Sequence, residues 1–190
     1  MKVVKSSAMP TALPARIAWG VEHLELTHDA HVLEIGCGAG HALGLIVARL
    51  TTGTVTGLDR SETQLIKARG HHASAIASGR ILLIHDTLER ATFPRGYDRV
   101  LAINVNAFWT TPRRSLPPLA RCLAPGGRLW IVYEPPSPTK LRELEASLTT
   151  YLAEERLVVR SVVTERIGRT HLFGVSAQLD ARSATSTSGR

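Results

Sequence analysis

The chain has 190 residues, of which 44% are hydrophobic and 21% are charged, a balance typical of one globular domain. It holds only two cysteines and no stretch near the ~20 apolar residues of a membrane span, which excludes a disulfide framework and leads us to expect a cytoplasmic protein without membrane contact. The net charge is +7, but the arginines are scattered and no aromatic residues interleave with a basic run, so we assign the charge to a solvated surface and expect no nucleic-acid partner.

Short apolar segments alternate with helical patterns along most of the chain. Helices are expected to begin at Pro14, after Gly40, at Ser61 and at Ser137. Ser61 is an N-cap candidate, and Gln64 three residues later completes a capping box. The strands expected between the helices are brief and almost continuously apolar, as in a parallel sheet that is buried on both faces. They are His31–Ile35, Thr54–Leu58, Ile81–His85, Arg99–Ile103 and Leu129–Tyr133.

Two further strands, Val158–Glu165 and His171–Gln178, end the predicted sheet. The residues between them are too few for a crossover, so the pair must be antiparallel. The sequence therefore predicts an α/β fold: a doubly wound, mostly parallel sheet with an antiparallel edge hairpin and helices on both faces. We expect a single domain over residues 1–180 and a disordered tail over 181–190, which is small and polar.

Three alternating glycines, Gly36, Gly38 and Gly40, follow the first strand and precede a helix. Glycines permit a tight turn and a close approach of the backbone to a ligand, and the helix start adds free N–H groups. Asp59 follows the second strand, where a carboxylate suits the two hydroxyls of a ribose. The alternative is that Asp59 is an ordinary loop acid that caps the helix near Ser61.

The kind of ribose-bearing cofactor follows from two positions next to this turn. A dinucleotide fingerprint would place its third glycine where this chain has His41. Glu34 lies just before the turn, and an acid there suits an amino-acid cofactor, which has an ammonium group and no pyrophosphate. Both positions favour such a cofactor over NAD.

In these motifs the sequence resembles the class I S-adenosylmethionine-dependent methyltransferases. Glu34–Gly40 is similar to the first motif of the family, and Gly57–Asp59 is similar to the second. The later motifs are matched by Asp86, by the strand Tyr97–Ile103 with Asn104, and by the turn Leu123–Gly127. The resemblance spans about Pro14 to Gln178 and implies a seven-stranded sheet, S-adenosylmethionine as cofactor and S-adenosylhomocysteine as product. It implies these cofactor-binding residues: Glu34, Gly36, Cys37, Gly38, Gly40, Asp59, Arg60, Asp86, Thr87 and Asn104, with Asp86 at the adenine amino group and the Asn104 carbonyl at the methionyl part.

One segment departs from the family pattern. Pro117 and Pro118 occupy a helix that the family usually keeps uninterrupted. We therefore expect that helix to be kinked or split.

Polar and aromatic residues at the strand ends are the candidates for the acceptor side. His41, Asn106 and Glu134 are the predicted catalytic residues, and Phe108 and Trp109 the predicted substrate-binding residues. Each has a plainer interpretation: the aromatic pair as packing under a loop, His41 as a helix-start residue and Glu134 as a loop charge. The adjacent His71 and His72 are predicted to be solvated. No metal-ligand spacing is present, so we expect no metal.

The predicted function is methyl transfer from S-adenosylmethionine to a small-molecule acceptor, because the next helix follows Glu134 at once and leaves no room for an inserted substrate domain. An RNA or protein methyltransferase is an alternative, although the stretch Asn104–Phe108 lacks the Pro-Pro-aromatic signature of many amino-methylating nucleic-acid enzymes. A binding protein without catalysis and an NAD-type oxidoreductase are further alternatives.

Overall fold

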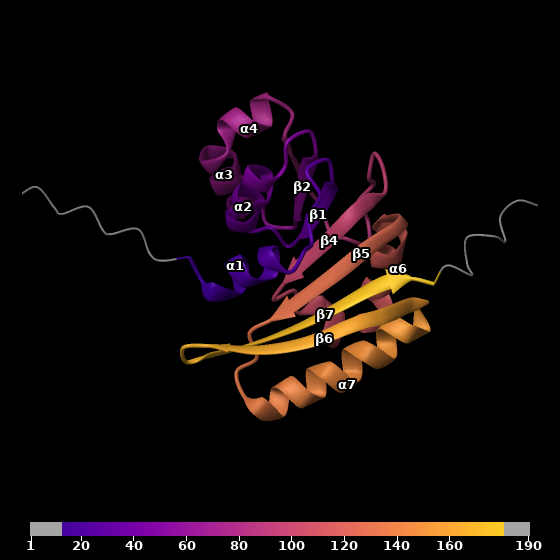
Figure 1. The fold of residues 1–190 in the computed structure, drawn as a ribbon. Helices are drawn as coiled ribbons and strands as arrows, with labels where there is room; N and C mark the ends of the chain where they lie inside the picture. The colour runs from indigo at the N-terminus through magenta and orange to yellow at the C-terminus, as the bar shows by residue number, and fades with distance from the viewer. Residues whose placement is uncertain (1–12, 181–190) are drawn as a thin grey trace, which may run out of the picture.

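The computed structural model describes residues 13–180. Its centre is a seven-stranded sheet in the order β3-β2-β1-β4-β5-β7-β6, seen in Figure 1. The strands are β1 His31–Ile35, β2 Thr54–Asp59, β3 Ile81–His85, β4 Tyr97–Ile103, β5 Leu123–Tyr133, β6 Leu157–Ile167 and β7 Thr170–Leu179. All five strands from β1 to β5 pair in parallel, and β7 pairs antiparallel with both β5 and β6. The predicted fold is confirmed: β6 forms the edge of the sheet, and β7 lies between β5 and β6.

Helices cover both faces of the sheet. They are α1 Ala15–Glu22, α2 His41–Arg49, α3 Glu62–His71, α4 Ala73–Ala77, α5 Ala107–Thr110, α6 Pro112–Cys122 and α7 Pro138–Glu154. Strand side chains alternate between the two faces: Val32 joins the core under α1 to α4, whereas Leu33 and Ile35 join the core under α5 to α7. In Figure 1, α7 lies along β6 and β7, opposite the α1–α4 side.

The predicted helix starts are confirmed, with one change in the capping of α3. The Ser61 side chain accepts a hydrogen bond from Gln64 N at 3.4 Å, as expected of an N-cap. The N–H of Ser61 donates to Asp59 instead of to Gln64, so an aspartate completes the motif in place of the predicted capping box. Ser137 caps α7 by accepting from Lys140 N at 3.2 Å.

The helical segment after β4 breaks at a different residue from the one predicted. α5 ends at Thr110 and α6 begins at Pro112, so Thr111 separates them. Pro117 and Pro118 lie inside α6, which is continuous from Pro112 to Cys122. The expected split at the two prolines is therefore wrong, and the interruption comes earlier, beside the cavity described next.

None of the helices between residues 13 and 180 is long and apolar enough to cross a membrane. The predicted tail over 181–190 and the expected start of the domain before Leu13 lie outside the described residues.

Candidate functional site

A cavity of about 610 Å³ lies where β1, β2 and β4 end, and α5 and the start of α6 complete its wall. Because β1 lies between β2 and β4, this is the point where the strand order reverses, and ligands of open α/β sheets bind at such points. The lining includes these residues of the predicted site: Gly36, Asp59, Arg60, Asp86, Thr87, Asn104, Asn106 and Phe108. The structure therefore brings the ends of β1, β2 and β4 and the residues that follow β3 together around one space.

The turn between β1 and α2 has a left-handed backbone at each of its alternating glycines. The φ angles are +71° at Gly36, +54° at Gly38 and +80° at Gly40, which residues with a Cβ rarely adopt. The N–H groups of Gly36 and Cys37 donate to Leu58 O at 2.8 and 3.1 Å. These bonds fasten the turn to the end of β2.

Asp59 ties the same turn to the start of α3. Its Oδ2 accepts from Gly38 N at 2.7 Å, and its Oδ1 accepts from Ser61 N at 2.8 Å. Each oxygen of a carboxylate can accept a second hydrogen bond, and the side chain lines the cavity. Asp59 therefore caps backbone N–H groups and still presents acceptors to a ligand, so the two interpretations of this residue are compatible.

Glu34 lies beneath the turn and is 4% exposed. Its Oε2 has no hydrogen-bond partner among residues 13–180. Burial, followed by the nearby charge of Asp59, holds the pKa of the Glu34 carboxyl well above its usual range. A buried carboxyl oxygen without a partner is costly, so its presence here suits a ligand that brings a positive charge. Burial likewise raises the pKa of the Cys37 thiol, which makes Cys37 a packing residue rather than a nucleophile.

Asp86 and Thr87 follow β3 on the far side of the cavity from β4. Asp86 N donates to Asp59 O at 3.2 Å, and Thr87 N donates to Asp86 Oδ1 at 2.8 Å. Arg90 Nε lies 3.6 Å from Asp86 Oδ1, and because the arginine is exposed this ion pair contributes little stability. The carboxylate of Asp86 is thus held in the lining of the cavity, and the adenine contact stays a prediction.

Asn104 joins the ends of β4 and β5. Its φ of +53° is left-handed, its N–H donates to Val132 O at 2.8 Å, and its Oδ1 accepts from Glu134 N at 2.9 Å. The Glu134 carboxylate in turn accepts from Arg16 Nη1 of α1 at 2.7 Å. The predicted catalytic Glu134 therefore lies beside Asn104, outside the cavity lining, in an ion pair with α1.

Three of the predicted acceptor-side residues, Asn106, Phe108 and Trp109, lie in α5 or at its N-cap. Asn106 lines the cavity, and its Oδ1 accepts a 3.4 Å hydrogen bond from Trp109 Nε1. The Lys140 ammonium lies 3.9 Å from the centroid of the Trp109 ring, a cation–π contact. Phe108 is fully buried in the core, so packing accounts for most of its surface.

The histidines lie behind the glycine turn rather than in the cavity. His41 is exposed and stacks on His71 with ring centroids 5.8 Å apart. His72 is half-buried, and both His71 and His72 contact backbone carbonyls of the turn. The prediction that this adjacent pair is simply solvated is wrong for His72. Among the described residues no group of three His, Cys, Asp or Glu side chains could hold a metal ion.

A family model for the methyltransferase domain matches residues 33–129, just over half of the 190 residues. This stretch contains the glycine turn, Asp59, Asp86 and Asn104. The chain belongs to the class I S-adenosylmethionine-dependent methyltransferase family.

Similar sequences carry methyltransferase names. The uncharacterized methyltransferase YdaC of Bacillus subtilis is 28% identical over 130 residues, which cover 68% of this chain and 66% of the relative. Trans-aconitate 2-methyltransferase of Streptomyces avermitilis is 32% identical over 129 residues, which cover 65% of this chain and 48% of the relative. The chain thus spans less than two thirds of the length of these relatives.

Solved methyltransferases share the fold. A SAM-dependent methyltransferase from Aquifex aeolicus has a TM-score of 0.71 at 19% identity, with 86% of this chain and 89% of that chain covered. Magnesium protoporphyrin IX methyltransferase from Synechocystis, solved with bound SAH, has a TM-score of 0.67 at 18% identity, with 86% and 80% covered. At such identities the likeness concerns the fold alone.

Several residues around the cavity carry no signal in the sequence. They come from the segment after β3 and from the junction of α5 and α6: Leu88, Glu89, Thr110, Thr111, Arg114 and Ser115. They do not form a motif, because loops and a short helix bring them together in space. The one available indication is that both segments follow strand ends, where ligands of such sheets bind.

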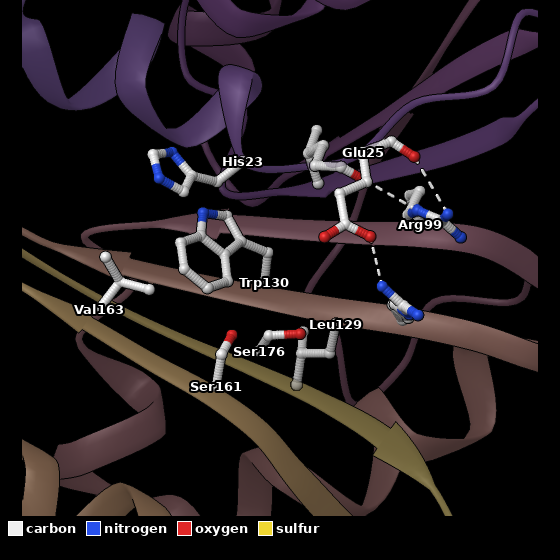
Figure 2. A pocket seen from close by; sticks show the side chains of 10 residues that line it. His23, Glu25, Arg99, Leu129, Trp130, Ser161, Val163 and Ser176 are labelled. Atoms are coloured by element: carbon white, nitrogen blue, oxygen red, sulfur yellow. Dashed lines mark hydrogen bonds and ion pairs between the residues drawn. The ribbon is translucent and has the colours of Figure 1, made fainter.

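The methyltransferase domain has a second, smaller hollow of about 170 Å³ on the α1 side of the sheet. Figure 2 shows it between His23 and Glu25 and the side chains of β5, β7 and β6. The His23 ring stacks on Trp130 with centroids 5.4 Å apart. Glu25 pairs with Arg128 across the hollow. Because these charged and aromatic groups engage one another, we assign the hollow to the anchoring of α1 on the sheet.

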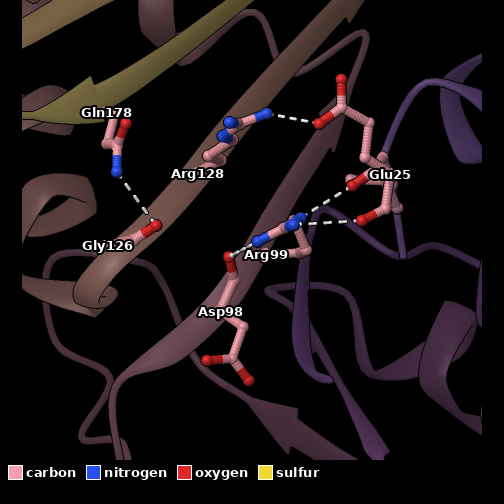
Figure 3. Close-up of polar contacts among 7 residues, drawn as sticks. Glu25, Asp98, Arg99, Gly126, Arg128 and Gln178 are labelled. Carbon is pink, nitrogen blue, oxygen red and sulfur yellow. Dashed lines mark hydrogen bonds and ion pairs between the residues drawn. The ribbon is translucent and has the colours of Figure 1, made fainter. Parts of the chain in front are cut away.

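Arg99 is the centre of that anchor (Figure 3). Its guanidinium donates to Leu24 O at 2.8 Å, to Glu25 O at 3.0 Å and to Asp98 O at 2.8 Å. Glu25 has a left-handed φ of +48°, and the contact holds this strained turn against β4. Burial, followed by the neighbouring Arg128, lowers the pKa of Arg99.

We predict that Arg99→Met lowers the free energy of unfolding by about 1–3 kcal/mol, because three carbonyls lose a charged donor. Affinity for S-adenosylhomocysteine should not change, since Arg99 does not line the cavity. Urea unfolding of Arg99→Met beside Arg160→Met, an exposed residue of β6, measures the effect. Equal losses in the two variants would contradict the anchoring role.

Proposed function

We propose that residues 1–180 form a single methyltransferase domain that binds S-adenosylmethionine in the cavity and transfers its methyl group to a small-molecule acceptor. The observation that carries the proposal is the pair of acids at the glycine turn. Asp59 presents free acceptors to the cavity, and Glu34 beneath the turn has an oxygen without a partner. A ribose supplies two hydroxyl donors, and an amino-acid moiety supplies an ammonium group.

The cavity suits a cofactor of this size and chemistry. Its volume of about 610 Å³ lies within the ~300–1,000 Å³ of typical ligand pockets. An added Cβ at Gly38 would meet nothing within 4 Å, so the backbone is open to a ligand there. In this proposal Asp59 binds the ribose, Asp86 with Thr87 binds the adenine amino group, and Arg60 flanks the adenine ring.

The methionyl end is assigned to the turn and to β4. Glu34 and the backbone of Gly36, Cys37, Gly38 and Gly40 face the ammonium and carboxylate groups, and the Asn104 carbonyl completes this end. The positive φ of Asn104 supports the assignment, because strained backbone persists where the surroundings fix it and clusters at ligand sites.

The acceptor is assigned to the opening between α5 and the residues after β5. Asn106 lies in the cavity lining, and Trp109 and Glu134 lie beside it, held by Lys140 and Arg16. S-adenosylmethionine supplies an activated methyl group on a sulfonium. The protein's own task is then to orient the acceptor and exclude water. His41 and Glu134 both lie outside the cavity lining, but Glu134 N donates to Asn104, which lines it. Asn106 in the lining and Glu134 beside it are therefore the better candidates for contact with the acceptor.

A small acceptor is favoured by the short connection from Glu134 to α7, which leaves no inserted domain at the opening. The names of relatives point the same way, since they include trans-aconitate and ubiquinone-biosynthesis methyltransferases. An RNA or protein acceptor and a non-catalytic cofactor-binding protein are the competing functions.

Transfer of a labelled methyl group from S-adenosylmethionine separates these functions. The purified chain is incubated with a metabolite extract, with RNA and with a protein fraction, and Asp59→Ala is run as the control. Label in the metabolite fraction that depends on Asp59 supports the proposal. Label confined to RNA or protein contradicts the small-molecule acceptor, and cofactor binding without label in any fraction contradicts catalysis.

A further inference from the structure

Two histidines from the end of α3 reach the carbonyl side of the glycine turn. His71 Nδ1 lies 3.0 Å from Ala39 O, and His72 Nε2 lies 2.7 Å from Gly40 O. Carbonyl oxygens only accept, so each of these ring nitrogens donates. His72 is the better buried of the two, and its Nε2 carries the proton.

The His72 ring occupies a slot made by Gly40, the N-cap of α2, and Gly44 inside the helix. A Cβ at Gly40 would lie 3.0 Å from His72 Cδ2, and a Cβ at Gly44 would lie 2.9 Å from His72 Cε1. Gly44 lies inside α2, where glycine is unfavourable by about 0.5–1 kcal/mol relative to alanine. The space for the ring is therefore a physical reason for glycine at this position.

Together these contacts hold the turn from both sides. Its N–H groups are bound by Leu58 O and by the Asp59 carboxylate at the end of β2. Gly40 O, on the opposite side, accepts from His72 and also from Gly44 N at 3.2 Å, at the first turn of α2. Without the histidine, only the helix itself would orient this carbonyl.

We propose that His72 is a positioning residue for cofactor binding: its ring, seated in the Gly40–Gly44 slot, holds the glycine turn in the conformation that receives S-adenosylmethionine. This inference rests on the proposed function of the same site. His72 does not line the cavity and acts through the backbone of the turn.

The first test compares affinity for S-adenosylhomocysteine by calorimetry in wild type, His72→Ala and His72→Gln. His72→Ala is expected to raise the Kd about tenfold, the effect of one lost hydrogen bond and its packing. His72→Gln keeps an N–H donor within reach and should restore most of the affinity. The matched control is His28→Ala, because His28 Nδ1 contacts Arg49 O at 3.2 Å at the other end of α2. It should leave the Kd unchanged.

The second test uses the slot. Gly44→Ala in the wild-type background pushes a Cβ against the ring and should raise the Kd several-fold. In the His72→Ala background the slot is empty, so Gly44→Ala should not raise the Kd further and should raise the melting temperature through better helix propensity. Such dependence of one substitution on the other measures coupling between the two residues.

The outcomes separate this inference from the proposed function. Wild type that does not bind S-adenosylhomocysteine overturns the proposed function, whatever the variants do. Wild type that binds, with His72→Ala lowering only the melting temperature at unchanged Kd, overturns the positioning role and leaves the function intact. Equal effects of Gly44→Ala in both backgrounds would also overturn it.

Discussion

Replacement of Asp59 by alanine is expected to weaken binding of S-adenosylhomocysteine by about 2–3 kcal/mol, or about 30- to 150-fold. Charge-assisted hydrogen bonds to the ribose hydroxyls are lost, and water recovers part of that loss. The N–H groups of Gly38 and Ser61 also lose their acceptor. We therefore expect a fall of about 1 kcal/mol in the free energy of unfolding of the ligand-free protein.

Calorimetry and melting curves of the same proteins separate the two effects. Asp98→Ala is the matched control, because Asp98 Oδ2 accepts a hydrogen bond from His31 N at 2.8 Å. His31 begins β1, whereas the glycine turn follows the other end of that strand. Asp98→Ala should lower stability and spare affinity. If Asp59→Ala behaves like Asp98→Ala, with a lower melting temperature and unchanged affinity, Asp59 is a backbone cap and not a ribose ligand.

Replacement of Glu34 by glutamine should have opposite effects on stability and binding. The buried carboxyl has a raised pKa because of burial. As the pH rises above about 4.3, the unfolded chain loses this proton first. The wild-type free energy of unfolding therefore falls as the pH rises toward the folded pKa. Glutamine does not titrate, so at pH 8 we expect Glu34→Gln to be more stable than wild type by about 1–3 kcal/mol, with a smaller difference at pH 5.

The same substitution should raise the Kd for S-adenosylmethionine at least ~10-fold, because a charge-assisted contact to the ammonium group is worth about 1.5–3 kcal/mol. Urea unfolding at pH 5 and pH 8, with calorimetry at pH 8, measures both effects. Glu22→Gln, on the exposed end of α1, is the control and should change neither. A stability difference without pH dependence, or unchanged affinity, would contradict this role of Glu34.

Local sequence patterns predicted the sheet and the glycine turn because the physics of both is local. Strands such as Ile81–His85 follow from apolar runs, and the turn follows from glycines that the backbone requires. The N-cap at Ser61 follows for the same reason, although Asp59 rather than Gln64 completes it.

The remaining features depend on where distant segments meet. His72 lies 32 positions after Gly40 in the sequence, and no pattern in the residues around His72 indicates a contact with the turn. Arg114 and Ser115 line the cavity from the start of α6, just after the break at Thr111. Glu134 forms an ion pair with Arg16, which lies 118 positions earlier in the sequence. Such contacts are set by packing of the helices, which a single sequence does not encode in any spacing.

Competitive calorimetry of the wild-type protein with S-adenosylhomocysteine and with NAD tests the central claim most directly. His41 replaces the third glycine of a dinucleotide turn, and the buried Glu34 suits an ammonium group rather than a pyrophosphate. We predict micromolar binding of S-adenosylhomocysteine and binding of NAD at least ~100-fold weaker. Tight binding of NAD without measurable binding of S-adenosylhomocysteine would contradict the assignment of the site.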